Sequence, residues 1–244
     1  MIIGIKNTIP ISNNLISKWL PSDESTLEAW YRNKEGITED VGVASWADSS
    51  SNSYDMVQAT DSQQPAYNAS TGALTFDDSD EQYLKSSSDI GGTDGLDTGF
   101  VIGFKINAGK NNIVNLGHSD SSTEMIKFGP SGNNVVRVKP ASSNVDFTME
   151  SGHNVQDDCS WIIVRKENDE VSVYKNLPTD DTLVQQDSAQ DIAGDFILNT
   201  IGRRGASSAN YFDGTMKEIV IFKAVADADS DNLIDHLGDH LKTL

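Results

Sequence analysis

VASWADSSSNSYDMVQATDSQQPAYNASTGALTFDDSDEQYL, the stretch from Val43 to Leu84, decides the fold of this chain. Apolar runs alternate in it with polar turns, and they predict strands at Val43 to Trp46, Tyr54 to Ala59 and Ala73 to Phe76, the last running on towards Tyr83. Ser, Asn and Asp side chains bind their own backbone in compact turns, so the linkers need no helix. The stretch therefore predicts three short strands joined by polar turns.

Strand signals continue on both sides of this stretch. Residues 100–106 and 161–164 are apolar on both faces, as expected for central strands of a packed sheet. Further strands are predicted over 27–31, 113–116, 125–128, 135–138, 171–174, 196–201 and 217–222, and a loop over Ser86 to Thr98. Roughly a dozen strands, with turn signals about every 8–12 residues and no alternating helices, predict an all-β, antiparallel two-sheet sandwich.

One helix is predicted, close to the last residue. Residues 227–230, DADS, supply acidic residues and a cap. Leu233, Ile234, Leu237 and Leu241 then follow at helical spacing.

Several motifs occur in a family-like order. WADSSSNSYD from Trp46, then a Q-P pair, then LTFDDSDEQYL from Leu74, resemble turns of the laminin-G and concanavalin A-like domains. Ser51, Ser53 and Asp78 stand where that family has turn glycines. These departures put any carried-over binding site in doubt more than they do the fold.

The resemblance extends to the second half of the chain. The hairpin over 161–176 and the closing segment over 201–222, which begins I-G-R-R, are similar to family patterns, so the likeness covers about residues 27–242. It implies a jelly-roll, lectin-like sandwich of the kind that is found on bacteriophage structural and adhesion proteins. Leu177 replaces a family glycine.

The first 20 residues differ in character from the rest. They hold two lysines and no acid, whereas the remainder holds 16 basic and 37 acidic residues, a net charge of −21. We expect an arm over 1–26 and a sandwich over 27–244. The arm is predicted to dock the protein to a neighbour through its apolar residues Ile2, Ile3, Ile5, Ile9, Ile11, Ile16 and Trp19. The alternative, an extra strand of the same domain, stays open.

Composition limits the partners. A net charge of −19 argues against nucleic acid, whose phosphates would be repelled. The single cysteine, Cys159, excludes an internal disulfide. No apolar run approaches the roughly 20 residues of a membrane span, and the N-terminal run lacks the features of a signal peptide. We therefore expect a chain that folds in a cytoplasm and binds no membrane.

No catalytic pattern stands out. Glycoside hydrolysis needs two carboxylates on opposite sides of the bond, and no predicted strand carries acids at i and i+2. Glu124 and Glu218 each open a strand without such a partner. Cys159 follows His153 by six residues, but a cysteine beside a buried strand is more often a core residue. We expect no enzymatic activity.

Metal binding is the harder question. His236 and His240 lie four residues apart, but no third zinc ligand is identifiable, which favours surface positions on a polar helix face. Oxygen-rich turns suit calcium better. The candidate ligands are Asp48, Asn52, Asp55, Asp77, Asp78 and Asp80, which the family resemblance places near one end of the sandwich. The competing interpretation is that these are solvated turn residues without an ion.

A lectin-like role would need exposed aromatic rings with polar neighbours. The glycan-binding candidates are Tyr54, Tyr67, Tyr83 and Tyr211, together with Tyr31. Trp30, Trp46 and Trp161 lie in strand patterns and are predicted to be core residues.

These observations favour a non-enzymatic module that serves as a structural or adhesion component of a bacteriophage-like virion, assembled in the host cytoplasm. Its partners would be other virion proteins or further copies of itself, and host-surface polysaccharide. Two alternatives stay open: a free glycan-binding protein, and a glycosidase or polysaccharide lyase whose acids the pattern does not reveal.

Overall fold

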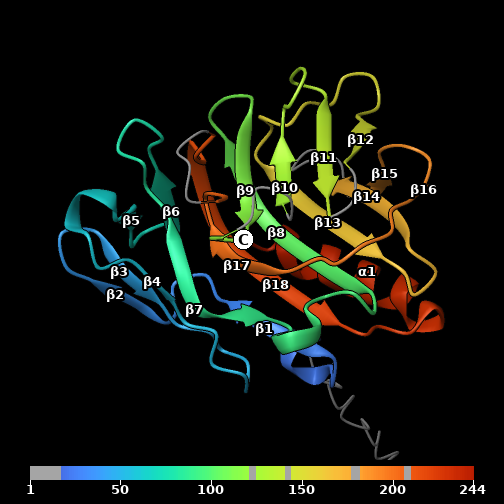
Figure 1. Cartoon of the computed structure of the whole chain (residues 1–244), viewed down its shortest axis with the longest axis horizontal. Helices are drawn as coiled ribbons and strands as arrows, with labels where there is room; N and C mark the ends of the chain where they lie inside the picture. The colour runs from blue at the N-terminus through green and yellow to red at the C-terminus, as the bar shows by residue number, and fades with distance from the viewer. Residues whose placement is uncertain (1–17, 121–124, 141–143, 177–181, 206–209) are drawn as a thin grey trace, which may run out of the picture.

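Two antiparallel sheets and a C-terminal helix form the chain in the computed structural model, which describes residues 18–120, 125–140, 144–176, 182–205 and 210–244 (Figure 1). Sheet A contains β1 (Leu27–Tyr31), β5 (Ala66–Asn68), β6 (Ala73–Phe76), β8 (Phe100–Ala108), β13 (Cys159–Arg165), β14 (Glu170–Asn176), β15 (Val184–Gln185), β16 (Gln190–Asp191) and β18 (Gly214–Lys223). Sheet B contains β2 (Ile37–Glu39), β3 (Val43–Trp46), β4 (Met56–Val57), β7 (Leu84–Ile90), β9 (Ile113–Gly117), β10 (Met125–Phe128), β11 (Val135–Lys139), β12 (Val145–Thr148) and β17 (Leu198–Ile201). The predicted antiparallel two-sheet sandwich is confirmed.

The strand order explains how distant segments meet. Sheet A runs β15-β14-β13-β8-β18-β6-β5, with β1 also paired to β18 and β16 to β14. Sheet B runs β12-β11-β10-β9-β17-β7-β4-β3-β2. Three 3-10 turns, η1 (Pro21–Asp23), η2 (Asp61–Gln63) and η3 (Gly92–Asp94), and the helix α1 (Asp227–Lys242) complete the described elements. No helix in the described part of the chain is long and apolar enough to cross a membrane.

The central strands β8, β13 and β18 are apolar on both faces because they serve two cores. Their inward side chains, such as Phe104 and Trp161, join the core between the sheets. Their outward side chains, such as Ile162 and Val220, pack under the apolar side of α1. Gly103 permits this approach, since an added Cβ would lie 2.5 Å from Leu237 Cδ2. Burial of Phe104 and Trp161 confirms their predicted core positions.

Three predicted boundaries are wrong. The strand predicted from Tyr54 to Ala59 covers only Met56–Val57. Residues 86–98 are not one loop, because β7 continues to Ile90 and pairs with β17 and β4. Leu84, Ser86 and Ile90 of this strand are buried, so pairing between neighbours overrides the weak strand preference of its serines. The helix is capped at Ala226, without a side-chain hydrogen bond, rather than by the DADS sequence.

The predicted docking arm is described only at its end. Ile2, Ile3, Ile5, Ile9, Ile11 and Ile16 lie outside the described residues. The indole of Trp19 lies 5.4 Å from the His236 ring and 6.4 Å from the Phe222 ring, and its Nε1 donates a hydrogen bond to Glu24. Trp19 thus packs on the chain's own helix and sheet, whereas docking to a neighbour stays a prediction.

Candidate functional site

Pairing at the start of β18 gathers three loops. Gly214 pairs with Phe76 on one side and with Ala108 on the other. The residues just before Gly214 therefore lie beside the turn that leaves β6 and the turn that leaves β8. This register brings Asp213 next to Asp77, Asp78 and Lys110, although they are far apart in the sequence.

Asp77, Asp78 and Asp213 are the one group of three acidic, histidine or cysteine residues that lies within reach of a single ion among the described residues. Lys110 forms an ion pair with Asp78, and its Nζ lies 4.0 Å from Asp213. Burial and the neighbouring Asp78 raise the pKa of Asp213, while Lys110 opposes the shift. The lysine ammonium already supplies the positive charge here, so calcium would have to displace it.

Asp77 itself shapes its turn. Its Oδ1 accepts hydrogen bonds from the Ser79 amide at 2.8 Å and the Ser79 hydroxyl at 2.6 Å, which lowers the pKa of the carboxyl. The next candidate, Asp80, is exposed and lies outside the three-acid group. Calcium binding at this turn stays a prediction.

The turn between β3 and β4 uses its acids differently. Asp48 Oδ1 accepts from the amides of Trp30 and Ser50, both at 2.8 Å. Asp55 accepts from the Asp48 amide at 2.9 Å, and Asn52 donates to a backbone carbonyl. These side chains hold the turn against β1. The structure does not bring Asp48 or Asp55 into the group formed at the β6–β7 turn.

The pairing of β7 with β17 places aromatic rings near the group formed by Asp77, Asp78 and Asp213. Leu84, the first residue of β7, pairs with Ile201, the last residue of β17. Tyr83 therefore lies beside Arg203, whose Cζ is 4.0 Å above the tyrosine ring. Tyr211 approaches from the segment before β18, with its ring centroid 6.4 Å from that of Tyr83.

We call Tyr83, Arg203 and Tyr211 the tyrosine cluster. Both tyrosines are partly exposed, and the Tyr211 hydroxyl lies 3.5 Å from Glu81 Oε2. Burial and Glu81 raise the pKa of Tyr211, which keeps its phenol protonated. Two neighbouring rings, one of them under a guanidinium, offer an apolar surface with hydrogen-bonding groups at its rim, which is the composition of a small-molecule site.

The other tyrosine candidates are less available. Tyr31 is fully buried and donates its hydroxyl to the Tyr54 carbonyl at 2.7 Å, so its place among the candidates is wrong. Tyr54 packs on the core and donates its hydroxyl to Glu28 at 2.8 Å. It also lines a pocket of about 410 Å³ with Asp89. Tyr67 packs on the core from β5.

Sequence reasoning missed Arg203, Asp213 and Lys110. A signal existed for the first of them: two consecutive arginines, Arg203 and Arg204, in a chain with few basic residues. Asp213 and Lys110 carried no comparable signal, because only the pairing of β18 places them beside Asp78.

Glu218 and His240 form a buried pair that the sequence did not reveal. Glu218 lies inside β18 and accepts hydrogen bonds from His240 Nε2 at 2.5 Å, from the Trp30 indole at 2.8 Å and from the Asn33 amide at 3.1 Å. His240 is only 7% exposed, so the expectation of a surface histidine is wrong for it. It is correct for His236.

The remaining catalytic candidates show no paired geometry. Cys159 is buried, and burial raises the pKa of its thiol to about 12. His153 Nδ1 lies 3.0 Å from Gln186 Oε1, a partner of its own. Glu124 lies outside the described residues. The thiol is a protonated core group at neutral pH, in agreement with the core interpretation of Cys159.

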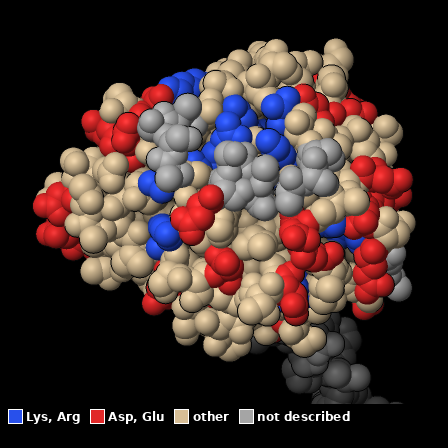
Figure 2. Space-filling model, in the orientation of Figure 1, with Lys and Arg blue, Asp and Glu red and all other residues tan. Residues whose placement is uncertain are grey.

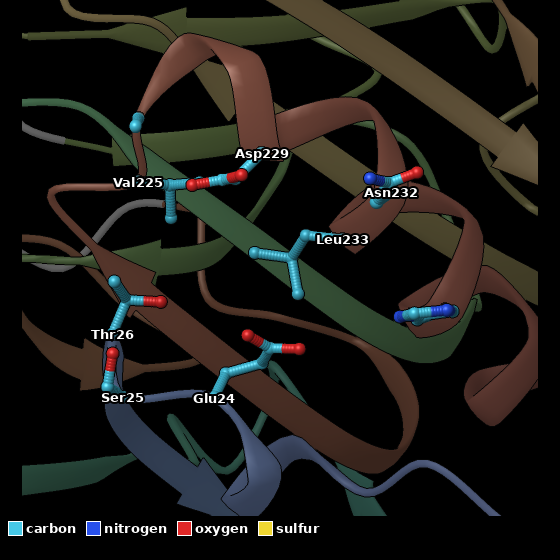
Figure 3. A pocket seen from close by; sticks show the side chains of 9 residues that line it. Glu24, Ser25, Thr26, Val225, Asp229, Asn232 and Leu233 are labelled. Atoms are coloured by element: carbon cyan, nitrogen blue, oxygen red, sulfur yellow. The ribbon is translucent and has the colours of Figure 1, made fainter.

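A further pocket lies between the segment before β1 and the first half of α1 (Figure 3). It has a volume of about 310 Å³ and is lined by Glu24, Ser25, Thr26, Val225, Ala226, Asp229, Asn232, Leu233 and His236. Its lining includes two carboxylates but no tyrosine, tryptophan, lysine or arginine. The tyrosine cluster is therefore the better candidate for a ligand with apolar ring faces.

Comparisons with known proteins support the fold. No family model matches the chain, and no curated protein matches its sequence. An arabinofuranosidase complexed with arabinofuranosyl-α-1,2-xylobiose matches with 14% identity and a TM-score of 0.55, over 82% of this chain and 51% of its own. The chain thus spans about half the length of that enzyme.

Two other solved structures match at similar levels. Domain 4 of AbnA, a GH43 extracellular arabinanase from Geobacillus stearothermophilus, in complex with arabinotriose, is 13% identical, with a TM-score of 0.54, over 87% of this chain and 98% of its own. The binding domain of Paraclostridial Mosquitocidal Protein 1 is 12% identical, with a TM-score of 0.55, over 88% and 52%. At these identities the likeness shows the β-sandwich fold alone.

Proposed function

We propose that the chain is a glycan-binding module that holds its ligand at the tyrosine cluster without cleaving it. The observation that carries this proposal is the pair of partly exposed rings, Tyr83 and Tyr211, fixed beside Arg203. Sugar rings present C–H faces that pack on aromatic rings and hydroxyl groups that bind a guanidinium or carboxylate. The domain of an arabinanase with the same fold, which was solved with arabinotriose, gives the proposal a precedent.

The surroundings of Glu218 argue against hydrolysis. Glu218 is 3% exposed and is occupied by three hydrogen-bond donors. Asp78 and Asp213 are closer to solvent, but Lys110 lies against both. Neither arrangement leaves one protonated and one ionised carboxyl free on opposite sides of a sugar bond, which glycoside hydrolysis needs.

The test is affinity electrophoresis of the purified chain in native gels that contain single polysaccharides, both neutral and acidic. We expect slower migration in at least one polysaccharide, together with no release of reducing sugar from it. The control is a gel that contains the same concentration of an unrelated inert polymer. Equal mobility in every gel would contradict glycan binding, and reducing sugar released above a heat-treated control would contradict the absence of catalysis.

The adhesion role expected from the sequence extends this proposal. A weak glycan site becomes an effective attachment device when many copies are displayed together, because each further contact is made at a high effective concentration. A virion component would supply such display, and the acidic surface would discourage clumping between copies. Mass spectrometry of purified particles tests this role: the chain must be present in particles and absent from the cleared supernatant.

A further inference from the structure

Basic residues gather on sheet B although the chain has twice as many acids as bases. Figure 2 shows a group of Lys and Arg side chains over β9, β10 and β11, with Asp and Glu side chains on the surface around it. The residues are Lys127 on β10, Arg137 and Lys139 on β11, and Arg204 after β17. The positive charges of the other three lie close enough to Lys127 to lower its pKa. We call these four residues the basic cluster.

The register of sheet B assembles the basic cluster. Lys127 pairs directly with Arg137, and Met125 pairs with Lys139, which places these basic residues on two adjacent strands. Ile126 and Phe128 point into the core, so Lys127 points to the outer face of sheet B. Arg204 reaches this face because its segment crosses Gly117, where an added Cβ would lie 2.4 Å from the Arg203 carbonyl.

Lys127 is the unusual member of the basic cluster. Only 6% of it is exposed, and among the described residues it has no hydrogen-bond or ion-pair partner. Arg137, by contrast, makes a two-pronged ion pair with Asp146, at 2.6 and 2.8 Å. Most of the Lys127 side chain is buried, and a cation in such surroundings is normally paired. No acid among the described residues pairs with Lys127, which makes an external anion a candidate partner.

The basic cluster and the tyrosine cluster adjoin in the sequence at Arg203 and Arg204. Arg203 lies over the Tyr83 ring, and the charge of the next residue, Arg204, lowers the pKa of Lys127. A ligand that packs a sugar ring on Tyr83 and Tyr211 would extend past Arg203 towards Lys127. Sugars that carry an anionic group bear a carboxylate or a sulfate ester on the ring.

We propose that the basic cluster binds the carboxylate or sulfate group of an acidic polysaccharide whose neighbouring sugar rings lie on the tyrosine cluster. This inference rests on the proposed glycan binding and names the class of glycan. Lys127 supplies the central charge, and Arg204 and Lys139 flank it. A negatively charged glycan could thus bind this negatively charged protein, because the surface at the basic cluster is positively charged.

The proton on Lys127 makes this binding depend on pH. Burial first, and then Arg204, Arg137 and Lys139, lower the pKa of Lys127 to about 8. Among the described residues, the charged groups on this side are these three cations and Asp146, which is paired with Arg137. An anion binds the protonated amine, so affinity should be constant below pH 7 and should fall about tenfold between pH 7 and pH 9. Without ligand, the free energy of unfolding should rise between pH 7 and pH 9. The reason is that Lys127 loses its proton in the folded chain over this range but keeps it in the unfolded chain, where its pKa is about 10.5.

The experiment measures binding of the full chain to two matched pairs of polymers by biolayer interferometry: polygalacturonate with its methyl ester, and dextran sulfate with dextran. We expect the charged member of at least one pair to bind at least tenfold more tightly than its neutral partner. Lys127→Met should remove that preference while leaving the melting temperature unchanged or higher. Lys34→Met, the same change of charge at an exposed turn, should leave binding unaffected.

The outcomes separate the two proposals. If neutral and charged members bind equally, glycan binding stands and the anionic specificity is wrong. If no polymer in this set or in the native-gel panel binds, glycan binding itself fails. Charged-polymer binding that Lys127→Met leaves intact, or that persists at pH 9 with unchanged affinity, would overturn the role of Lys127. A lower melting temperature in Lys127→Met would assign the lysine a structural role instead.

Discussion

Glu218→Ala is expected to lower the free energy of unfolding by about 3–5 kcal/mol, because the buried carboxylate accepts three hydrogen bonds at once. Its removal leaves the Trp30 indole and His240 Nε2 without an acceptor between β1, β18 and α1. For a chain of this size the melting temperature should fall by about 10 °C. Denaturant unfolding of the purified variant measures the loss.

The matched control for this variant is Glu39→Ala, since Glu39 is exposed on β2. Substitutions at such surface positions usually stay within about 0.5 kcal/mol of the parent. Glu218→Gln keeps one oxygen acceptor and should lose less stability than Glu218→Ala. A Glu218→Ala variant as stable as Glu39→Ala would mean that Glu218 does not hold the helix to the sheet.

Tyr83→Ala and Tyr211→Ala are each expected to weaken glycan binding about 30-fold, or about 2 kcal/mol, which is typical of an aromatic residue at the centre of a binding site. Both rings are partly exposed, so the variants should remain folded. Tyr83→Phe should retain binding, because the ring face rather than the hydroxyl makes the contact. Titration calorimetry with an oligosaccharide of the retained polysaccharide measures the change.

Tyr67→Ala is the informative comparison for the tyrosine variants. Tyr67 came from the same sequence reasoning but lies on β5 and packs on the core. We expect its loss to reduce stability and to leave affinity unchanged. If Tyr67→Ala weakens binding as much as Tyr83→Ala, the ligand lies elsewhere than on the tyrosine cluster.

The central strands could be predicted because their apolar pattern is contained in a few consecutive residues. Residues 100–106 and 161–164 are apolar on both faces, and only a strand covered on both sides tolerates that pattern. The sequence alone did not show that α1 provides the outer cover. In the turn over 51–53, Ser53 adopts a positive φ of 61°, a conformation that favours glycine.

The candidate site was only half predictable. Asp77, Asp78, Tyr83 and Tyr211 were candidates by residue type, but as two separate sites. Which of them meet depends on long-range registers, such as Gly214 with Phe76, that no local pattern encodes. His240 was misjudged for the same reason, because its partner Glu218 belongs to a strand 22 residues earlier.

Amide chemical-shift mapping of the full chain with a bound oligosaccharide tests the glycan site on sheet B most directly. The expected result is a continuous set of shifted amides that includes Tyr83, Arg203 and Tyr211 and extends to Lys127 on β10. Shifts confined to the pocket between Glu24 and His236, or to the pocket beside Tyr54, would contradict a binding site on this face of sheet B.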